Sequence, residues 1–274
     1  MLSLAQMAVE VLTTADGRAK TALSHQHALS WRAARAAAAP LEIGHATPPQ
    51  RPARPDKPEL LDPREVPRRR PGSPQGRIAL LHAVAHIELN AVDLHWDIIA
   101  RFTDTPMPLG FYDDWVQAAD DESKHFNLLC DCLEAMGSHY GALPAHAFMW
   151  QAAEDTATDL LGRLAVVPMV LEARGLDVTP GMIALFTQAK ETQALAALNI
   201  IYTEEVAHVA YGSKWFNWLC GRAGDDPKEV FHTLVRRYFH GNLKPPFNDE
   251  KRAEAGMPPD FYWPLVDAMG GPSS

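Results

Sequence analysis

Apolar residues recur along four stretches of the chain at alternating steps of three and four, the spacing that places side chains on one face of an α-helix. The pattern predicts long helices over residues 77–102, 111–136 and 151–174. Gly137 and Gly175 are expected to end the second and the third of these helices, because glycine is common just past a helix C-terminus. Nothing in the pattern predicts a sheet, so the fold class is all-α.

The fourth helical pattern begins at Thr179 and Pro180, which supply an N-cap and a proline at the first helical position. It reaches Cys220, a span of about 40 residues that exceeds an ordinary globular helix. We therefore expect this stretch to break near Lys190.

The flanking segments have different characters. Residues 1–39 have helical spacing and an alanine-rich run, whereas ten of the 22 prolines fall in residues 40–76. Proline lacks the N–H that regular structure needs, so this part is expected to be an extended connector. After a further helix near 227–240, the tail is rich in proline and predicts loops. The expected organisation is an N-terminal helical extension (1–39), a Pro-rich connector (40–76), a four-helix bundle (77–221), and a C-terminal helix with a covering arm (222–274).

Each of the four apolar stripes is interrupted near its middle by a glutamate, and two stripes carry a histidine one turn later. Several carboxylates brought together inside a bundle are strongly unfavourable unless something compensates their charge. Two divalent cations would compensate it, while a metal-free bundle is the alternative. The candidate metal ligands are Glu88, Glu122, His125, Glu172, Glu205 and His208.

The spacing of these residues fits metal binding. In Glu-x-x-His the two side chains lie on one helix face, so Glu122 with His125, and Glu205 with His208, can each aim a carboxylate and an imidazole at one point. Two such motifs and one glutamate from each remaining helix form the ligand set of di-iron and di-manganese carboxylate proteins. Carboxylate oxygens with one imidazole per metal favour two iron ions, with manganese or a mixed Mn/Fe pair as alternatives. The three cysteines, a lone Cys-x-Cys at residues 130–132 and Cys220, do not form the paired motif of a structural zinc site.

Other polar residues near these stripes are weaker candidates for chemistry. His95 is expected to be a core histidine rather than a ligand, because it lies about 10 Å along the helix axis from Glu88. His82 and His86 flank the first stripe and are expected to support the site or to join helices. Tyr202 and Tyr211 are expected to pack in the core, with proton or electron transfer as the alternative. Three acidic residues are candidates to orient a ligand imidazole through its other nitrogen, and the sequence does not choose among them: Asp93, Asp121 and Glu204.

At these residues the chain resembles the ferritin-like superfamily, and more narrowly a bacterial family of ferritin-like domains of unknown function. The resemblance covers roughly residues 75–265. It implies that Glu122 and Glu205 bridge the two metals and that Glu88 and Glu172 are terminal ligands. The segments that carry it are HAVAHIELNAVDLHWDIIARF (82–102), DDESKHFNLL (120–129), PMVLEARGLDVTP (168–180), IIYTEEVAHVAYGSKWFNWLC (200–220) and PPFNDEKRAEAGMPPDFYWPL (245–265).

These features favour an oxidoreductase that uses a reduced dimetal centre to activate O2 on an unknown small-molecule substrate, with an electron donor as a partner. Pro168, one turn before Glu172, is expected to bend the third helix beside the site. Two alternatives are an iron-handling or ferroxidase protein that protects against oxidative stress, and a helical interaction protein with structural metal. The aromatic residues of the tail either cover the site or serve as a packing arm.

The bulk composition limits the partners and the location. The 274 residues carry a net charge of −9, which argues against general nucleic-acid binding and against hydroxylation of an RNA base. The first 30 residues show no signal-peptide pattern, and no stretch reaches the ~20 apolar residues that span a bilayer. We expect a cytoplasmic protein without a membrane contact, and a homodimer as its assembly.

Overall fold

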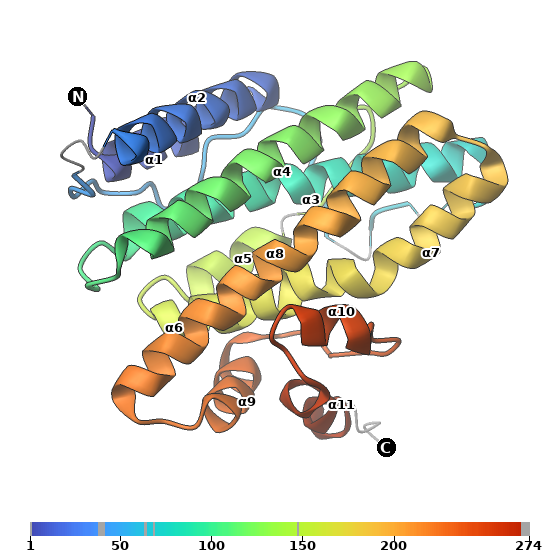
Figure 1. Ribbon diagram of the computed structural model, residues 1–274. Helices are drawn as coiled ribbons and strands as arrows, with labels where there is room; N and C mark the ends of the chain where they lie inside the picture. Colours follow the sequence, from blue (N-terminus) through green and yellow to red (C-terminus); the bar gives the residue numbers. More distant parts are fainter. Residues whose placement is uncertain (1, 38–41, 63–64, 68, 147, 270–274) are drawn as a thin grey trace. The chain divides into compact units, whose positions relative to one another are not determined.

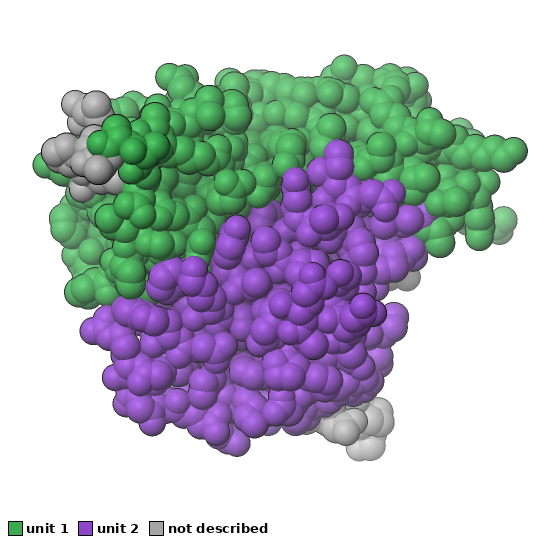
Figure 2. Space-filling model, in the orientation of Figure 1, with its two compact units in different colours: residues 1–151, 184–197 green, residues 152–183, 198–274 purple. Residues whose placement is uncertain are grey.

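The structure is a computed structural model that describes residues 2–37, 42–62, 65–67, 69–146 and 148–269 (Figure 1). The regular elements of these residues are helices, and their only strand-like pairing is an isolated bridge between Leu60 and Ala145. The all-α prediction is therefore confirmed. The chain divides into two compact units, residues 1–151 with 184–197 (unit 1) and residues 152–183 with 198–274 (unit 2), shown in Figure 2. Each unit is described by itself.

Unit 1 is built on two long helices, α3 (Pro74–Arg101) and α4 (Leu109–Ala135), which pack against each other. The N-terminal helices cover them: α1 (Leu4–Thr13) packs on α3, and α2 (Gly17–Ala36) packs on α4. The start of α2 lies very close to α4, because a Cβ at Gly17 would meet Phe126 Cζ at 2.9 Å. The first turns are capped as the sequence favours, with Asp16 accepting from Ala19 N and Ser73 accepting from Gly76 N.

The described part of the connector is extended and follows the helices of unit 1. Its backbone is tied to them at intervals: Leu4 N donates to Glu42 O at 3.0 Å, and Ala53 N donates to Leu12 O at 2.8 Å. Leu61 N donates to Ala145 O at 2.8 Å, which joins the connector to the segment after α4. Residues 42–62 form no helix, and their only strand-like pairing is the bridge at Leu60.

Unit 2 begins within α5 (Phe148–Asp155), resumes after an interruption at residues 156–159, and then follows one helical path to residue 183, within α7. Here α6 (Leu160–Val166) passes into a π-helical segment, η1 (Val167–Glu172), and then into α7 (Ala173–Ala189). The unit also holds most of α8 (Thr192–Ala223) and the tail helices, of which α9 packs on α6. These are α9 (Pro227–Tyr238), α10 (Asp249–Glu254), η2 (Pro259–Phe261) and α11 (Trp263–Met269).

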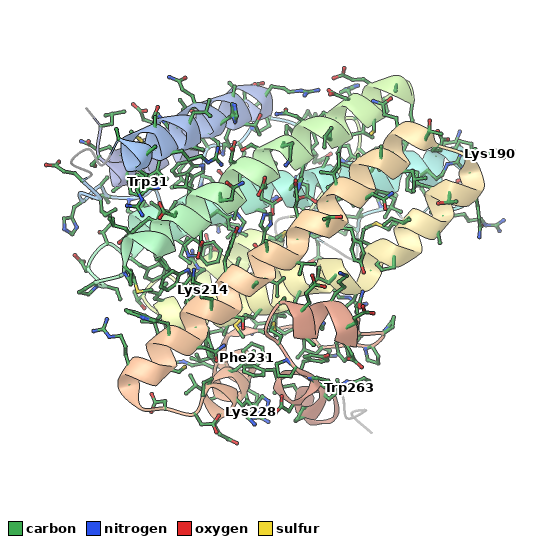
Figure 3. The ribbon with its side chains drawn as sticks, viewed as in Figure 1. Trp31, Lys190, Lys214, Lys228, Phe231 and Trp263 are labelled. Carbon is green, nitrogen blue, oxygen red and sulfur yellow. The ribbon has the colours of Figure 1, made fainter. Side chains whose placement is uncertain are left out.

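The predicted helices 77–102 and 111–136 are confirmed as α3 and α4, and Gly137, with φ of +74°, follows the second as expected. The predicted break near Lys190 is also confirmed. This residue has φ of +58° and lies between α7 and α8, where Figure 3 labels it. A positive φ is unusual for a residue with a side chain, so the turn is a marked feature of the backbone.

The prediction of one third helix that ends at Gly175 is wrong in two respects. The segment is interrupted between Asp155 and Leu160, and α7 runs without a break through Gly175 and Pro180. Two observations explain the continuity. A Cβ at Gly175 would meet nothing within 4 Å, so this position has room for a side chain and no turn there requires a glycine. The next residue, Leu176, has a fully buried side chain that anchors the helix. Burial of apolar side chains outweighs the local preference of proline to begin a helix.

The tail of unit 2 is more ordered than its prolines suggested. Arg252 is almost fully buried, donates to both oxygens of Asp177, and lies over the rings of Phe247 and Tyr262. Asn248 N also donates to Asp177, at 2.9 Å. These contacts make the tail a packing arm of unit 2, held at α7. Among the described residues, no helix has the length and apolar character needed to cross a membrane.

Candidate metal centre

Unit 1 brings three of the predicted ligands together between α3 and α4. Glu88 lies on α3, and Glu122 and His125 lie one turn apart on α4. Their side chains occupy stripe positions that apolar residues otherwise fill, such as Val92 and Leu129, both fully buried. Helix packing therefore carries two carboxylates and an imidazole into the interior. Their exposed fractions are only 4%, 1% and 0%.

The three side chains are close enough to share one ion. Each offers a ligand atom that lies within 4.8 Å of the others. His125 Nδ1 is 3.3 Å from Glu122 Oε2 and 3.4 Å from Glu88 Oε2. The imidazole nitrogen therefore faces both carboxylates, a convergence that the Glu-x-x-His spacing predicts only for the residues on α4.

The electrostatics of this cluster disfavour two ionised carboxylates. Burial raises the pKa of Glu88 well above its ordinary value, and the neighbouring Glu122 raises it further, while His125 acts in the opposite direction. Two like charges in a low-dielectric site cannot both ionise without compensation. Either a proton or a cation must neutralise the pair. A divalent cation could be bound by both carboxylates and by the imidazole at the same time.

The donor set fits such a cation. Buried carboxylate oxygens with one imidazole suit iron and manganese, and the set contains no thiolate that would favour a structural zinc. The cysteines do not join it: Cys130 and Cys132 are buried, and burial raises the pKa of each thiol, that of Cys130 to about 12. A group of buried Glu and His side chains that can hold a metal ion is therefore present in unit 1.

Unit 2 holds the other three predicted ligands. Glu172 is the last residue of η1, and Glu205 and His208 lie one turn apart on α8. All three are buried, with exposed fractions of 6%, 7% and 0%. His208 Nδ1 is 3.8 Å from Glu205 Oε2, so this Glu-x-x-His pair also directs both groups to one side of its helix. Tyr211 packs against the imidazole of His208.

Comparison with known proteins identifies the family. A model described as "Protein of unknown function (DUF455)" matches residues 13–263. The chain belongs to the DUF455 family. An uncharacterized protein of Haemophilus influenzae is 39% identical over 208 residues, which cover 74% of this chain and 72% of the relative. No solved structure matches the chain.

The histidines before Glu88 have other roles in this DUF455 protein. His86 Nδ1 is 2.8 Å from Tyr140 Oη, and its Nε2 is 3.1 Å from the carbonyl of His146. His82 Nε2 accepts from Gly141 N at 2.9 Å. Both histidines thus bind the segment that follows α4. His95 is buried against the ring of Trp115, in agreement with a core position.

Other polar residues that the sequence singled out have contacts of their own. Asp93 forms a buried ion pair with Lys20, and Asp121 accepts hydrogen bonds from Gln117 and Lys124. Tyr202 accepts a hydrogen bond from Asn248 of the tail at 2.7 Å. The burial of Lys20 was not predictable from the sequence, because a lysine in an amphipathic helix is ordinarily solvated and its partner Asp93 lies 73 positions away.

Proposed function

We propose that this DUF455 protein is a dinuclear metal carboxylate protein, with two irons as the metal, and that it acts as an oxidoreductase that activates O2. The proposed ligand set joins Glu88, Glu122 and His125 of unit 1 with Glu172, Glu205 and His208 of unit 2. The proposed arrangement is a ferritin-like four-helix bundle, as the resemblance of the sequence implies. Manganese in one or both positions is the alternative metal content.

The observation that carries the proposal is the buried cluster of Glu88, Glu122 and His125. A protein without metal would gain nothing from placing two carboxylates within 4.8 Å of each other at core positions. The paired motif in unit 2 repeats the same chemistry on α8, with Glu205 and His208 buried. Two identical motifs and two further buried glutamates match the donor count of a dinuclear site.

The bound irons would supply the one-electron chemistry and the binding of O2 that amino-acid side chains lack. The protein's own residues would do the rest. The carboxylates of Glu122 and Glu205 would help to hold the metals and neutralise their charge. Buried apolar neighbours such as Val92 and Leu129 would keep bulk water from the centre. The substrate is expected to be a small molecule, and an electron donor would return the centre to its reduced state.

Metal analysis of the purified chain tests the proposal directly. We expect close to two iron or manganese atoms per chain, and optical spectra of the reduced protein that change on mixing with O2. Glu122→Gln and His125→Ala should lower the metal content, because each removes a buried donor. Glu134→Gln is the matched control, since Glu134 lies on the same helix but is exposed and paired with Arg18.

Three results would contradict the proposal in different ways. Metal content unaffected by either α4 variant would show that the cluster is not the site. Accumulation of many irons per chain would favour iron storage over an enzyme. A bound metal pair whose spectrum is indifferent to O2 would favour a structural role for the metal.

A further inference from the structure

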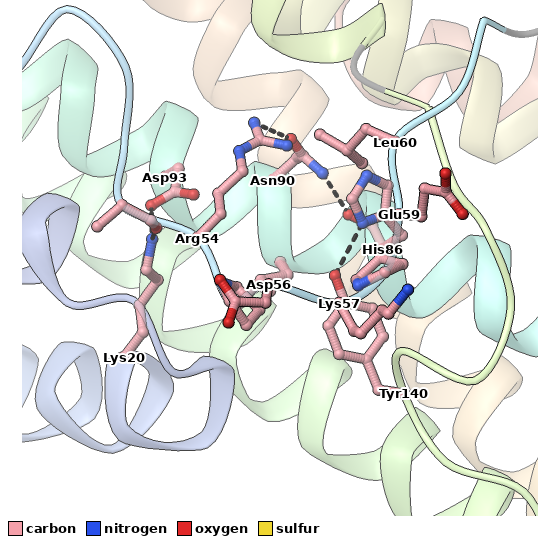
Figure 4. A pocket seen from close by; sticks show the side chains of 14 residues that line it. Lys20, Arg54, Asp56, Lys57, Glu59, Leu60, His86, Asn90, Asp93 and Tyr140 are labelled. Atoms are coloured by element: carbon pink, nitrogen blue, oxygen red, sulfur yellow. Dashed lines mark hydrogen bonds and ion pairs between the residues drawn. The ribbon is translucent and has the colours of Figure 1, made fainter.

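Unit 1 contains a cavity of about 430 Å³ that has no part in the proposed metal chemistry. Residues 53–60 of the connector form one wall, α3 forms another, and Lys20 and Tyr140 close the sides (Figure 4). The size is that of a pocket for a small organic molecule. Its lining combines apolar side chains with an unusual number of charged ones.

Arg54 is the residue that gives this cavity a chemical preference. Its Nη2 donates to Asn90 Oδ1 at 2.7 Å, and Asn90 Nδ2 in turn donates to the carbonyl of His86 at 2.6 Å, as Figure 4 shows. The guanidinium is therefore held in one orientation. Its Nη1 is buried and has no hydrogen-bond partner among the described residues. A buried donor of a charged group without an acceptor is costly, so an acceptor brought close to this guanidinium would be stabilised.

The charges around Arg54 show which ligand would complete it. Lys20 and Asp93 form a buried ion pair with each other, and Lys20 also donates to the carbonyl of Ala53. They neutralise one another and leave Arg54 as the excess positive charge in the interior of the cavity. The other charged lining residues are Asp56, Lys57 and Glu59, which are exposed at the mouth and screened by solvent. A single negative charge fits this balance better than a doubly charged group.

The remaining lining favours an organic body on that anion. Leu89, Pro55 and Pro58 present apolar surface to the cavity. On the far side, His86 Nε2 donates to a carbonyl, so its Nδ1 must accept from the hydroxyl of Tyr140. The oxygen of Tyr140 keeps lone pairs that can accept a hydrogen bond. The polar groups are thus few and fixed, as in other ligand pockets.

We propose that this cavity binds the carboxylate of a small organic acid with an apolar body, and that the guanidinium of Arg54 pairs with that carboxylate. The site is separate from the candidate metal centre. His86, Asn90 and Asp93 lie along one side of α3, whereas Glu88 is two residues from Asn90 and so about 200° around the helix from it. The inference therefore does not depend on the proposed metal chemistry.

Binding of simple probes to the full-length protein, followed by two-dimensional ¹H–¹⁵N NMR, tests the proposal. Sodium hexanoate should shift the backbone amide signals of the non-proline residues among 53–60 and of the neighbouring part of α3. Hexanamide, which has the same shape without the charge, should bind about tenfold or more weakly, because a charge-assisted hydrogen bond is lost. This comparison uses the unaltered chain, so it does not depend on the folding of any variant.

Variants then identify the residue responsible. Arg54→Gln should reduce hexanoate affinity to the level of hexanamide, whereas Arg51→Gln, an exposed arginine of the same connector outside the cavity lining, should not. Equal affinity for hexanoate and hexanamide, or hexanoate binding that survives Arg54→Gln, would overturn the proposal. Tighter binding of inorganic phosphate than of hexanoate would overturn the choice of a carboxylate.

Discussion

At the scale of single residues, unit 1 contains two kinds of buried charge. Lys20 and Asp93 are opposite charges that neutralise each other, whereas Glu88 and Glu122 are like charges that do not. The second kind was predictable from the sequence, because a glutamate in an apolar stripe stands out against its neighbours. The first kind was not, because a buried ion pair requires knowledge of which helix faces meet, and α2 and α3 are separated by the connector.

The ion pair between Lys20 and Asp93 makes a prediction about stability. Asp93→Ala should lower the free energy of unfolding by about 3–5 kcal/mol, because it leaves a buried ammonium group without its counter-charge. Replacing both residues, as Lys20→Met with Asp93→Leu, should recover most of this loss. Urea unfolding monitored by circular dichroism measures both effects.

The exposed pair of Arg18 with Asp131 offers the control for this measurement. Its atoms are 2.6 Å apart, but both side chains are about half exposed. Asp131→Ala should therefore cost no more than about 1 kcal/mol. A loss of similar size at Asp93 would show that the buried pair contributes little.

His82 makes a prediction about pH. Burial lowers the pKa of this imidazole to about 4, with smaller contributions from His139 and Arg69. The unfolded chain titrates near its ordinary value of about 6.5, so below that pH the unfolded state takes up a proton that the folded state refuses. Stability is present in full above about pH 6.5 and falls by up to about 1.4 kcal/mol per pH unit down to about pH 4.

The contribution of His82 can be isolated by comparing slopes rather than absolute stabilities. His82→Gln should make the fall in unfolding free energy between about pH 6 and about pH 5 shallower than in the wild type, by up to about 1.4 kcal/mol. Titrations at other residues, the carboxylate cluster included, contribute equally to both proteins. Identical slopes for the two proteins would show that His82 has the same protonation in the folded and in the unfolded state.

At the scale of helices, the sequence predicts a helix boundary correctly where the capping residues and the tertiary packing favour the same position. The limits of α3 and α4 follow from a serine cap, prolines and a terminal glycine, and they agree with the predicted ranges within three residues. The third predicted helix failed because Gly175 and Pro180 resemble a boundary, although α7 continues through both. The sequence predicted the π-helical segment η1 only as a bend at Pro168. Proline cannot donate a backbone hydrogen bond, and the sequence does not reveal how the neighbouring backbone bonds rearrange around it.

The contact between η1 and α8 within unit 2 makes a prediction about packing. A Cβ at Gly212 would lie 2.5 Å from both Cβ and Cγ of Pro168, closer than side chains can approach. Gly212→Ala should therefore destabilise the protein by about 1–3 kcal/mol, because the ring and the helix must move apart. Adding Pro168→Ala should remove part of this cost, so the double variant loses less than the sum of the single changes.

Gly221 provides a matched substitution on the same helix. It is exposed, and a Cβ there would meet nothing within 4 Å. Gly221→Ala should raise stability by roughly 0.5–1 kcal/mol through helix propensity alone. The same gain in stability for Gly212→Ala, measured by thermal or urea unfolding, would contradict the close approach of Pro168 to α8.

At the scale of the whole molecule, the candidate ligands are divided evenly between the two units. Unit 1 contributes Glu88, Glu122 and His125 from α3 and α4, and unit 2 contributes Glu172, Glu205 and His208 from η1 and α8. The sequence predicted the residue types and their burial, because charge in an apolar stripe is a local signal. It did not predict the division into units, which depends on long-range contacts.

The division leads to a prediction about metal binding that separates one shared site from a site confined to unit 1. If the six residues form one dinuclear centre, Glu88→Gln in unit 1 and Glu205→Gln in unit 2 should each lower the bound iron or manganese per chain, because each removes one carboxylate ligand. Metal bound to the folded state also stabilises it, so both variants should unfold at a lower temperature than the wild type in the presence of metal and more nearly at the same temperature after chelation. Glu229→Gln, an exposed glutamate on α9, is the control that should change neither quantity. Metal content that falls with Glu88→Gln but is unchanged by Glu205→Gln would confine the ions to α3 and α4, because the carboxylate on α8 would then have no part in holding them.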